Sequence, residues 1–546
     1  MSGVPGDQRR GRWRPRAAVG LAVAILLVVP SIPGALASGS VAELVRLPVE
    51  SLVILLLLTL TPWRVPRLVL ATLFGGFVGI AILLAGIDRG YQSALGIHFV
   101  PLDWLQLGDA YGVVAAAIGA LPASGLFTAA GAAVVGASAA VAWAAMRVDR
   151  LIRSRGESGR RALAAVTAAW IVAAAVATPL GVADPVAAAA STSSVGSAVS
   201  RTVAALQTRA AVAREIAADR FAGVPATQLV SRLAGKHIVI VFVESYGRVA
   251  LDESRFSAGV REVLARGDEM LAAEGYRTRS AWLTSPTFGG VSWLAHATLQ
   301  SGIWVDSQAV YDLVVRSDRL TLAAAFGEAG WRTVSDVPSN RRPWDVGSSF
   351  YHYDTLLDGT NVGYRGPAFS YARVPDQYTL KHFADEVLVP SASPVMAEID
   401  LVSSHTPWAP LPQLVPWDQA GDGRVYDGQP KAGEPAAEVW KDPRQVQRSY
   451  GRSIEYSLGS LLSFLENVDD PDLVVIALGD HQPSAIVSGE GAGHDVPVSI
   501  IAKDPAVFDA IAGWRWRPGL RPDHVAPIWR MDAFRDRFFD AFGAPR

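Results

Sequence analysis

The chain has 546 residues, enough for roughly three or four domains; half of them are hydrophobic and only 18% are charged. That balance is too apolar for a wholly soluble protein of this size, so part of the chain is expected to lie in a membrane. The net charge of −2 gives no sign of nucleic-acid binding, and the lack of cysteine excludes disulfides, thiolate metal ligands and cysteine nucleophiles.

Apolar residues concentrate in the first third of the chain, in stretches of about 20 residues, the length that crosses a bilayer. The five stretches are 17–37, 42–62, 67–87, 125–147 and 162–184. Arginines gather before the first stretch, between the second and third, and around the connection from the fourth to the fifth, and arginine-rich loops stay in the cytoplasm. We therefore expect a five-helix transmembrane domain over residues 1–184, with the N-terminus inside and the chain after about residue 185 outside.

Two features of this region leave alternatives open. Ala35-Leu-Ala37 resembles a signal-peptidase site, although cleavage there would not change the predicted topology. The helices could be only an anchor or could handle lipid directly. Residues 185–232 are expected to be a juxtamembrane linker with a helix near 197–221, whose arginines either meet lipid phosphates or lie on a solvated face.

From residue 236 the pattern changes to apolar runs that alternate with helical stretches. The runs, typical of strands buried on both faces, are 236–243, 396–402, 473–478 and 496–501. The predicted helices are 256–274, 292–302, 319–329 and 444–467. This alternation predicts an α/β domain with a mostly parallel sheet over residues 233–546. The segment 407–443, rich in Pro, Gly and Asp, is expected to be a long surface excursion near the active face.

Chemically active side chains follow three of these strands. Glu244 follows the first, His405 the second, and Asp480 with His481 the third. Parallel α/β sheets bind their ligands at the carboxyl ends of strands, and imidazole and carboxylate both suit zinc or manganese. Each residue alone could be an ordinary polar strand end, but together they predict a rim with metal-binding and acid–base chemistry.

Ser292 is the candidate nucleophile. It follows Gly289 and Gly290, which allow close approach of the backbone to a ligand, and it opens a predicted helix whose free N–H groups favour a phosphoryl group. A serine at this position could also be only an N-cap, and Thr287 is the next candidate hydroxyl.

On these residues the outer domain resembles the alkaline phosphatase/sulfatase superfamily, and within it the membrane-bound branch of lipoteichoic acid synthases, phosphoglycerol transferases and phosphoethanolamine transferases. The stretch Ser292–Ile303, which ends in Gln-x-Gly-Ile, follows the phosphoglycerol transferase pattern, and Asp480-His481 matches the metal-binding pair. Residues 450–456 resemble the helix before the last metal-binding strand. The resemblance covers nearly the whole chain, since those proteins have five membrane helices, a linker and an extracytoplasmic α/β domain with an alkaline-phosphatase-like fold.

The resemblance implies a metal site and a nucleophile. Glu244, Asp480 and His481 would bind a divalent ion (Mn, Mg or Zn) together with the oxygen of Ser292. Ser292 stands where the family usually has a threonine, which keeps the hydroxyl.

The resemblance also implies residues that contact the substrate. His405 and His494 match histidines that contact the transferred phosphoryl group, and they would act as catalytic acid and base. Trp344 lies near a tryptophan of the lipoteichoic acid synthases, and Arg341 and Arg342 stand in for the arginine of that motif. The histidine of the motif is replaced close to Val337, which leaves the head group open.

The implied activity is a metal-dependent transfer of a phosphoglycerol- or phosphoethanolamine-type group from a membrane phospholipid to an envelope glycan or lipid, through a covalent Ser292 intermediate. The protein would be a multi-pass protein of the bacterial cell membrane with an extracytoplasmic catalytic domain and no nucleic-acid partner. A membrane-tethered phosphodiesterase or sulfatase-type hydrolase is the alternative, although the formylglycine motif of sulfatases is absent. An envelope protein with a decayed site is a third, disfavoured because the proposed ligands are all present. The sequence leaves open the acceptor, the number of metals and the oligomeric state.

Overall fold

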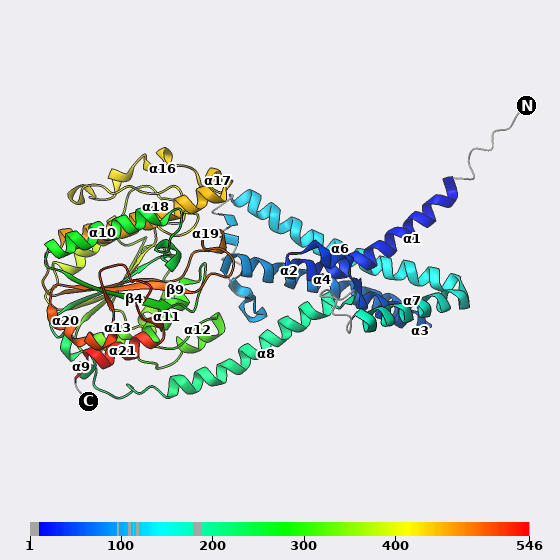
Figure 1. Ribbon diagram of the computed structural model, residues 1–546, viewed down its shortest axis with the longest axis horizontal. Helices are drawn as coiled ribbons and strands as arrows, with labels where there is room; N and C mark the ends of the chain where they lie inside the picture. Colours follow the sequence, from blue (N-terminus) through cyan, green and yellow to red (C-terminus); the bar gives the residue numbers. More distant parts are fainter. Residues whose placement is uncertain are drawn as a thin grey trace, which may run out of the picture. The chain divides into compact units, whose positions relative to one another are not determined.

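The structure is a computed structural model that describes residues 10–95, 98–106, 111–112, 114–115, 119–177 and 187–544. It divides into two compact units (Figure 1). The first comprises residues 1–92, 98–102 and 121–204, and the second comprises residues 93–97, 103–120 and 205–546.

The first unit is built from apolar helices. They are α1 (Arg10–Val28), α2 (Ile32–Ser38), α3 (Val49–Leu60), α4 (Arg64–Leu95), α6 (Ala120–Ser154) and α7 (Gly156–Ala177). Within the described residues, three helical stretches are long and apolar enough to cross a membrane: Ala17–Ser38, Arg64–Ser93 and Ala120–Ser154. These match the first, third and fourth predicted stretches, and the predicted count of five is not confirmed within the described residues.

The second predicted stretch is shorter in the structure, and the fifth lies only partly within the described residues. The helix expected over 42–62 is α3, which has only 12 residues. It is shorter because the residues before it form a 3₁₀ turn and the short strand β1 (Leu47–Pro48), which pairs with β2 (Ala187–Ala188). Helix α7 covers the start of the fifth stretch, whose residues 178–184 lie outside the described ones.

Helices α4 and α6 approach each other closely at small residues. A Cβ atom on Gly75 would collide with the carbonyl oxygen of Ser138, and one on Gly79 would collide with its hydroxyl. Small residues four apart let helix backbones pack closely in membranes, where no water is present to drive association.

One buried carboxylate also connects helices of this unit. Asp149 of α6 binds Arg67 of α4 at 2.7 Å and Arg153 at 3.0 Å. Arg153 in turn donates to the carbonyl oxygen of Thr61 at 2.7 Å, just after α3 ends. The two arginines compensate the buried charge of Asp149, and one of them satisfies carbonyl groups that the end of a helix leaves free.

The second unit is organised around a nine-stranded sheet. Its strands are β3 (His237–Val243), β4 (Arg277–Thr284), β5 (Arg332–Val337), β6 (Thr355–Asp358), β7 (Val395–Leu401), β8 (Leu473–Gly479), β9 (Asp495–Ala502), β10 (Arg517–Pro518) and β11 (Ile528–Arg530). The order is β10-β4-β9-β8-β3-β7-β5-β6, with β11 beside β4. From β8 to β6 all neighbours are parallel, whereas β9 is antiparallel to both β8 and β4. The predicted mostly parallel sheet is confirmed.

Helices cover both faces of this sheet (Figure 1). One face carries α10 (Ser257–Ala273), α15 (Asp376–Phe383) and α18 (Pro443–Asn467). The other carries α11 (Ser292–Ser301), α12 (Gln308–Val314), α13 (Leu322–Glu328), α20 (Pro505–Ala510) and α21 (Ala533–Phe542). The alternation of β3 follows this division, since Ile238, Ile240 and Phe242 join the core under α11 and the valines between them join the core under α18.

The remaining helices are shorter or peripheral to the sheet. They are α8 (Ala190–Ala217), α9 (Ala226–Leu229), α14 (Asp345–Ser349), α16 (Gln429–Ala432), α17 (Ala436–Val439) and α19 (Ala485–Ser488). The segment 407–443 contains α16, α17 and two 3₁₀ turns, and it contributes no strand to the sheet.

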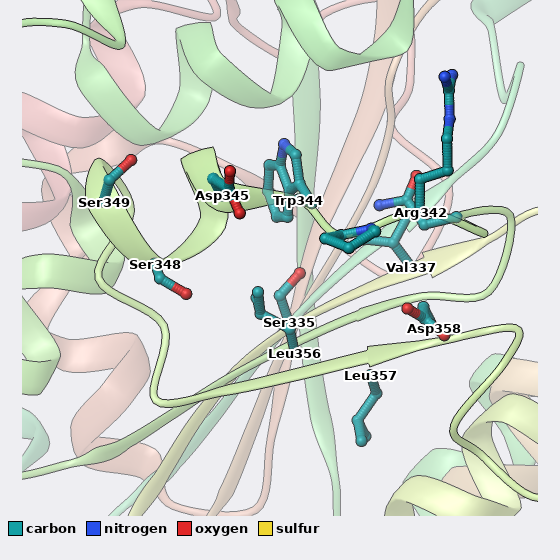
Figure 2. A pocket seen from close by; sticks show the side chains of 12 residues that line it. Ser335, Val337, Arg342, Trp344, Asp345, Ser348, Ser349, Leu356, Leu357 and Asp358 are labelled. Carbon is teal, nitrogen blue, oxygen red and sulfur yellow. The ribbon is translucent and has the colours of Figure 1, made fainter.

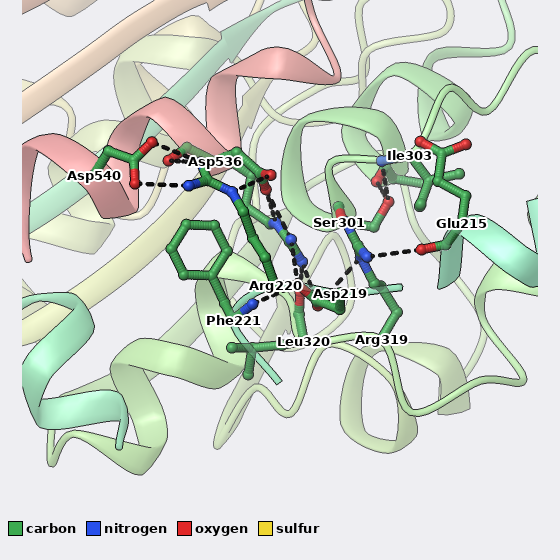
Figure 3. Close-up of polar contacts among 12 residues, drawn as sticks. Glu215, Asp219, Arg220, Phe221, Ser301, Ile303, Arg319, Leu320, Asp536 and Asp540 are labelled. Atoms are coloured by element: carbon green, nitrogen blue, oxygen red, sulfur yellow. Dashed lines mark hydrogen bonds and ion pairs between the residues drawn. The ribbon is translucent and has the colours of Figure 1, made fainter. Parts of the chain in front are cut away.

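A network of charged residues binds the segment after α8 to α21 and to the end of α11 (Figure 3). The buried Arg535 makes two hydrogen bonds to Asp219, at 2.9 and 2.8 Å. Arg319 lies 3.4 Å from the same carboxylate and donates to the carbonyl oxygen of Ser301 at 2.9 Å. Although burial opposes it, hydrogen bonding to Arg535 holds the pKa of Asp219 below its usual value.

Candidate active site and metal centre

The candidate site lies where β3 and β8 end and α11 begins. Val243 and Gly479 are register partners at the ends of these two parallel strands. The residues that follow them, Glu244 and Asp480, therefore emerge side by side at one edge of the sheet. Ser292 is the first residue of α11, on the face of the sheet that this helix covers.

The side chains of this edge meet in one cluster. The hydroxyl of Ser292 donates to Glu244 Oε2 at 2.9 Å and lies 3.2 Å from His481 Nε2. His481 Nε2 is also 3.3 Å from Glu244 Oε1 and 3.5 Å from Asp480 Oδ2. The potential ligand atoms of Glu244, Asp480 and His481 all lie within 4.8 Å of one another, a grouping that could hold a metal ion.

Surrounding hydrogen bonds orient these side chains. His481 Nδ1 lies 2.8 Å from the carbonyl oxygen of Gln482, so it carries the proton and leaves Nε2 free as a ligand. Asp480 Oδ1 accepts the backbone N–H groups of Ser245 and His481, both at 2.7 Å, which leaves Oδ2 pointing into the cluster. Tyr450 supports this arrangement, because its hydroxyl donates to the carbonyl oxygen of Ser245 at 2.9 Å. The donor set of one imidazole, two carboxylates and one hydroxyl fits a divalent ion.

The backbone before Ser292 is strained. Val291 has a φ of 58°, in the left-handed region that β-branched residues avoid. The segment after β8 stabilises this turn, because the N–H of Gly289 donates to the carbonyl oxygen of Gln482 at 2.8 Å. The helix cap is Val291, without a side-chain hydrogen bond, and the hydroxyl of Ser292 points to Glu244 and His481 instead. Ser292 is therefore not the N-cap that such a position usually signifies, and strain of this kind is common at functional sites.

Burial and crowded charges shift the pKa values of this cluster. Burial and the neighbouring charge of Glu244 raise the pKa of Asp480 to about 7. Although burial opposes both shifts, the hydrogen bond with His481 lowers the pKa of Glu244, and the charge of Asp480 raises the pKa of His481 to about 9. Two carboxylates thus share a site in which only a proton or a cation can compensate their charge.

The two other candidate histidines lie near this cluster without a recorded contact to Ser292. His405 follows β7 and stacks on Tyr371, with ring centroids 3.6 Å apart. Burial lowers the pKa of His405, although the charge of Glu244 opposes the shift. His494 lies with Nδ1 3.2 Å from the carbonyl oxygen of Ser285, whose hydroxyl donates to the carbonyl oxygen of Asp480 at 2.5 Å. His494 is thus connected to Asp480 through one intervening residue, Ser285.

The candidate head-group residues lie at the ends of β5 and β6. Trp344 and Arg342 line a cavity of about 370 Å³, together with Ser335 and Asp358 (Figure 2). Arg341 is exposed and is not among the residues that line it. Of the two arginines, Arg342 alone thus meets the cavity.

The prediction from sequence missed a second group of potential metal ligands. His296, Glu398 and Asp400 also have ligand atoms within 4.8 Å of one another. A signal was present, since two carboxylates alternate inside the otherwise apolar strand β7, and His296 follows Ser292 by four residues on one helix.

Neither a protein-family model nor a curated protein matches this chain. Several solved structures are similar to it. The integral membrane protein lipooligosaccharide phosphoethanolamine transferase A from Neisseria meningitidis is 13% identical with a TM-score of 0.40, over 94% of this chain and 95% of that chain. The lipoteichoic acid synthase LtaP from Listeria monocytogenes is 14% identical with a TM-score of 0.36, over 58% of this chain and 74% of that chain.

The Streptococcus pyogenes phosphoglycerol transferase GacH, solved with sn-glycerol-1-phosphate, is 12% identical with a TM-score of 0.35, over 61% of this chain and 91% of that chain. With TM-scores of 0.35 to 0.40, these similarities carry no conclusion about the family or activity of this chain.

Proposed function

We propose that this protein is a metal-dependent transferase of the membrane-bound branch of the alkaline phosphatase superfamily. It moves a phosphoglycerol- or phosphoethanolamine-type group from a membrane phospholipid to an envelope glycan or lipid. The observation that carries the proposal is the position of the Ser292 hydroxyl, 2.9 Å from Glu244 and 3.2 Å from His481 at the start of a helix. A hydroxyl among metal ligands and free backbone N–H groups is well placed to attack a phosphoryl group.

The metal ion would be held by Glu244, Asp480 and His481, with the oxygen of Ser292 beside them. When bound, such an ion lowers the pKa of a hydroxyl group and neutralises negative charge on a phosphate. The imidazole nitrogen favours Mn or Zn, and the three oxygen atoms keep Mg among the candidate ions.

Ser292 acts as the nucleophile in this proposal. Its hydroxyl proton passes to Glu244, the carboxylate to which it donates, as Oγ forms a bond to phosphorus; the bond from phosphorus to the lipid oxygen breaks, and His405 or His494 protonates the departing lipid alcohol. The acceptor hydroxyl then attacks the phosphoseryl ester and gives its proton to the same histidine, while the bond from phosphorus to Oγ breaks and Glu244 returns the proton to Ser292. Each transfer restores Ser292, which predicts ping-pong kinetics. Trp344 and Arg342, in the cavity beside β5 and β6, contact the head group.

The domain arrangement is part of the proposal. Residues 1–184 form the membrane domain, 185–232 the juxtamembrane linker and 233–546 the extracytoplasmic catalytic domain of a multi-pass protein of the bacterial cell membrane. The arginines between and beyond the apolar helices support a cytoplasmic N-terminus. An odd number of crossings, whether three or five, puts the catalytic domain on the opposite side, where the outer leaflet supplies lipid donor and glycan acceptor.

Trapping of the covalent intermediate tests the nucleophile and the donor together. The full chain in lipid nanodiscs is incubated with phosphatidylglycerol or phosphatidylethanolamine carrying a labelled head group, and label bound to denatured protein is measured. We expect label on the wild type and on Thr287→Val, a matched control that removes a neighbouring hydroxyl, and none on Ser292→Ala. Label retained by Ser292→Ala would refute the nucleophile.

The same experiment separates transfer from hydrolysis. With envelope glycan or a second lipid present, a transferase moves the label to that acceptor. Release of the labelled head group into water alone, with no labelled acceptor, would identify the protein as a membrane-tethered phosphodiesterase and refute the transferase.

A further inference from the structure

A second cluster of metal-ligating side chains lies next to the candidate active site. His296 Nδ1 is 2.9 Å from Glu398 Oε1 and 3.5 Å from Asp400 Oδ1. His296 belongs to α11, and the two carboxylates belong to β7. These separations are those of atoms that could share one ion, and they parallel the 3.3 and 3.5 Å separations around His481 Nε2.

The fold brings these three residues together for simple geometric reasons. His296 follows Ser292 by four residues, so both lie on one face of α11, about 6 Å apart along its axis. Glu398 and Asp400 alternate on β7 and therefore face the same side of the sheet. Phe242, the register partner of Asp400 on β3, stacks under His296 with ring centroids 3.7 Å apart. The second cluster therefore lies one helical turn beyond the nucleophile.

The hydrogen bonding of this cluster is incomplete. A single N–H on His296 Nδ1 serves one acceptor well, and Glu398 Oε1 is the nearer one. Asp400 Oδ1 is buried and has no hydrogen-bond partner within the described part of the chain. A buried carboxylate oxygen in that condition costs free energy, which a cation among the three groups would recover.

Glu398 is oriented by hydrogen bonds from residues outside the cluster, as metal ligands commonly are. Its Oε2 accepts a hydrogen bond from the hydroxyl of Tyr353 at 3.1 Å and another from the side-chain amide of Gln300. The amide oxygen of Gln300 is fixed in turn by the N–H of Ala323 at 2.9 Å. Neutral donors thus hold one carboxylate oxygen and leave the other, Oε1, directed at His296 and Asp400.

Four carboxylates gather in this region, in two neighbouring groups. Glu244, Asp480, Glu398 and Asp400 carry four negative charges when ionised, and among the described residues their ion pairs are with His481 and His296 alone. One divalent ion in the active-site cluster would balance two of these charges, and His296 can offer at most one positive charge to Glu398 and Asp400.

We propose that His296, Glu398 and Asp400 form a second divalent-cation site, separate from the cluster of Glu244, Asp480 and His481. One imidazole nitrogen with two carboxylate oxygens suits Zn²⁺ or Mn²⁺, whereas Mg²⁺ and Ca²⁺ prefer oxygen ligands throughout. The ion balances the two carboxylates beyond the nucleophile and joins α11 to β7. It thereby positions Ser292 without touching the substrate. The site goes beyond the proposed function and stands whether or not a phosphoryl group is transferred.

Metal content of the full chain tests this site. Protein purified in detergent is loaded with Zn²⁺ or Mn²⁺, washed to remove weakly held ions, and analysed by elemental mass spectrometry. We expect about two ions per chain in the wild type, about one in His296→Gln, about one in Asp480→Asn, and almost none when both changes are combined. His524→Gln, which removes an exposed histidine, is the matched control and should keep the wild-type content.

A stability measurement guards against loss of metal through misfolding. In the Asp480→Asn background, which leaves only the second site, Zn²⁺ should raise the melting temperature by several degrees, and adding His296→Gln or the isosteric Asp400→Asn should abolish that rise. One ion per chain in both the wild type and His296→Gln would overturn the proposal. So would an undiminished rise in the double variants. No lipid donor enters these measurements, so a failure of the proposed transferase leaves their outcome unaffected.

Discussion

Replacement of Arg535 by methionine should destabilise the catalytic domain strongly, because it leaves a buried carboxylate without its main partner. The guanidinium of Arg535 is fully buried and donates to both oxygens of Asp219, at 2.9 and 2.8 Å. It also donates to the carbonyl oxygen of Leu320 at 2.7 Å. Without it, the side chain of Asp219, only 4% exposed, keeps Arg319 at 3.4 Å as its nearest cation.

The expected loss is about 3–5 kcal/mol, the usual effect of removing one partner of a buried ion pair. The assay is thermal and urea unfolding of the full chain, followed by tryptophan fluorescence. Combining the change with Asp219→Asn should recover much of the loss, because the buried negative charge is removed while Arg319 keeps its hydrogen bonds to the carbonyl oxygens of Ser301 and Glu215. Arg537→Met, which changes a neighbouring exposed arginine, is the matched control and should alter stability little.

The pH dependence gives a second check on the same pair. In the wild type the pKa of Asp219 is lowered, so its stabilising contribution is present above the unfolded value, about 3.9, and is lost as the pH falls through the folded value. In Arg535→Met, burial should raise that pKa instead. The deficit of the variant should then be largest at neutral pH and shrink as the pH falls toward 4. A deficit that is small at pH 7, or unchanged by Asp219→Asn, would refute this reasoning.

Three further changes test other parts of the molecule. Tyr450→Phe removes the hydroxyl that supports Ser245, and we expect a fall of about 10–100-fold in metal affinity by calorimetric titration, with the melting curve of the metal-free protein little altered. Asp480→Asn should lower activity in the label-trapping assay by at least about 100-fold, since it removes a proposed ligand; full activity would contradict the assignment. Gly79→Leu should prevent close packing of α4 and α6 and reduce the yield of monodisperse protein in detergent, whereas Gly76→Leu, where a Cβ meets nothing within 4 Å, should not.

The continuous apolar strands were predictable from sequence, and the polar ones were not. The strands β3, β7, β8 and β9 lie where apolar runs indicated them. The strands β4, β5 and β6 went unrecognised, because their residues include arginine, threonine, serine and aspartate. Their place in the sheet depends on pairing with distant segments, such as β5 with β7, which local composition does not encode.

Some residues of the candidate site could likewise be predicted from the sequence, and others could not. Glu244, Asp480 and His481 were found because each follows a recognisable strand, and Ser292 because it follows two glycines before a helix. Arg341 and Arg342 are adjacent in sequence, so only the direction of the loop distinguishes the one that meets the cavity. The cluster of His296, Glu398 and Asp400 was not predicted. The two carboxylates were interpreted only as part of an apolar strand, and His296 only as part of the motif that begins at Ser292.

The guanidinium of Arg319 connects α11, which carries Ser292, to the end of α8. One of its nitrogens donates to the carbonyl oxygen of Ser301, the last residue of the helix that begins with Ser292, and another donates to the carbonyl oxygen of Glu215, near the end of α8 (Figure 3). The nucleophile helix is therefore tethered at its far end to the segment that leads out of α8. A displacement of Glu215 must either break these hydrogen bonds or pull on α11. Tension in that segment would therefore act on the helix that carries Ser292.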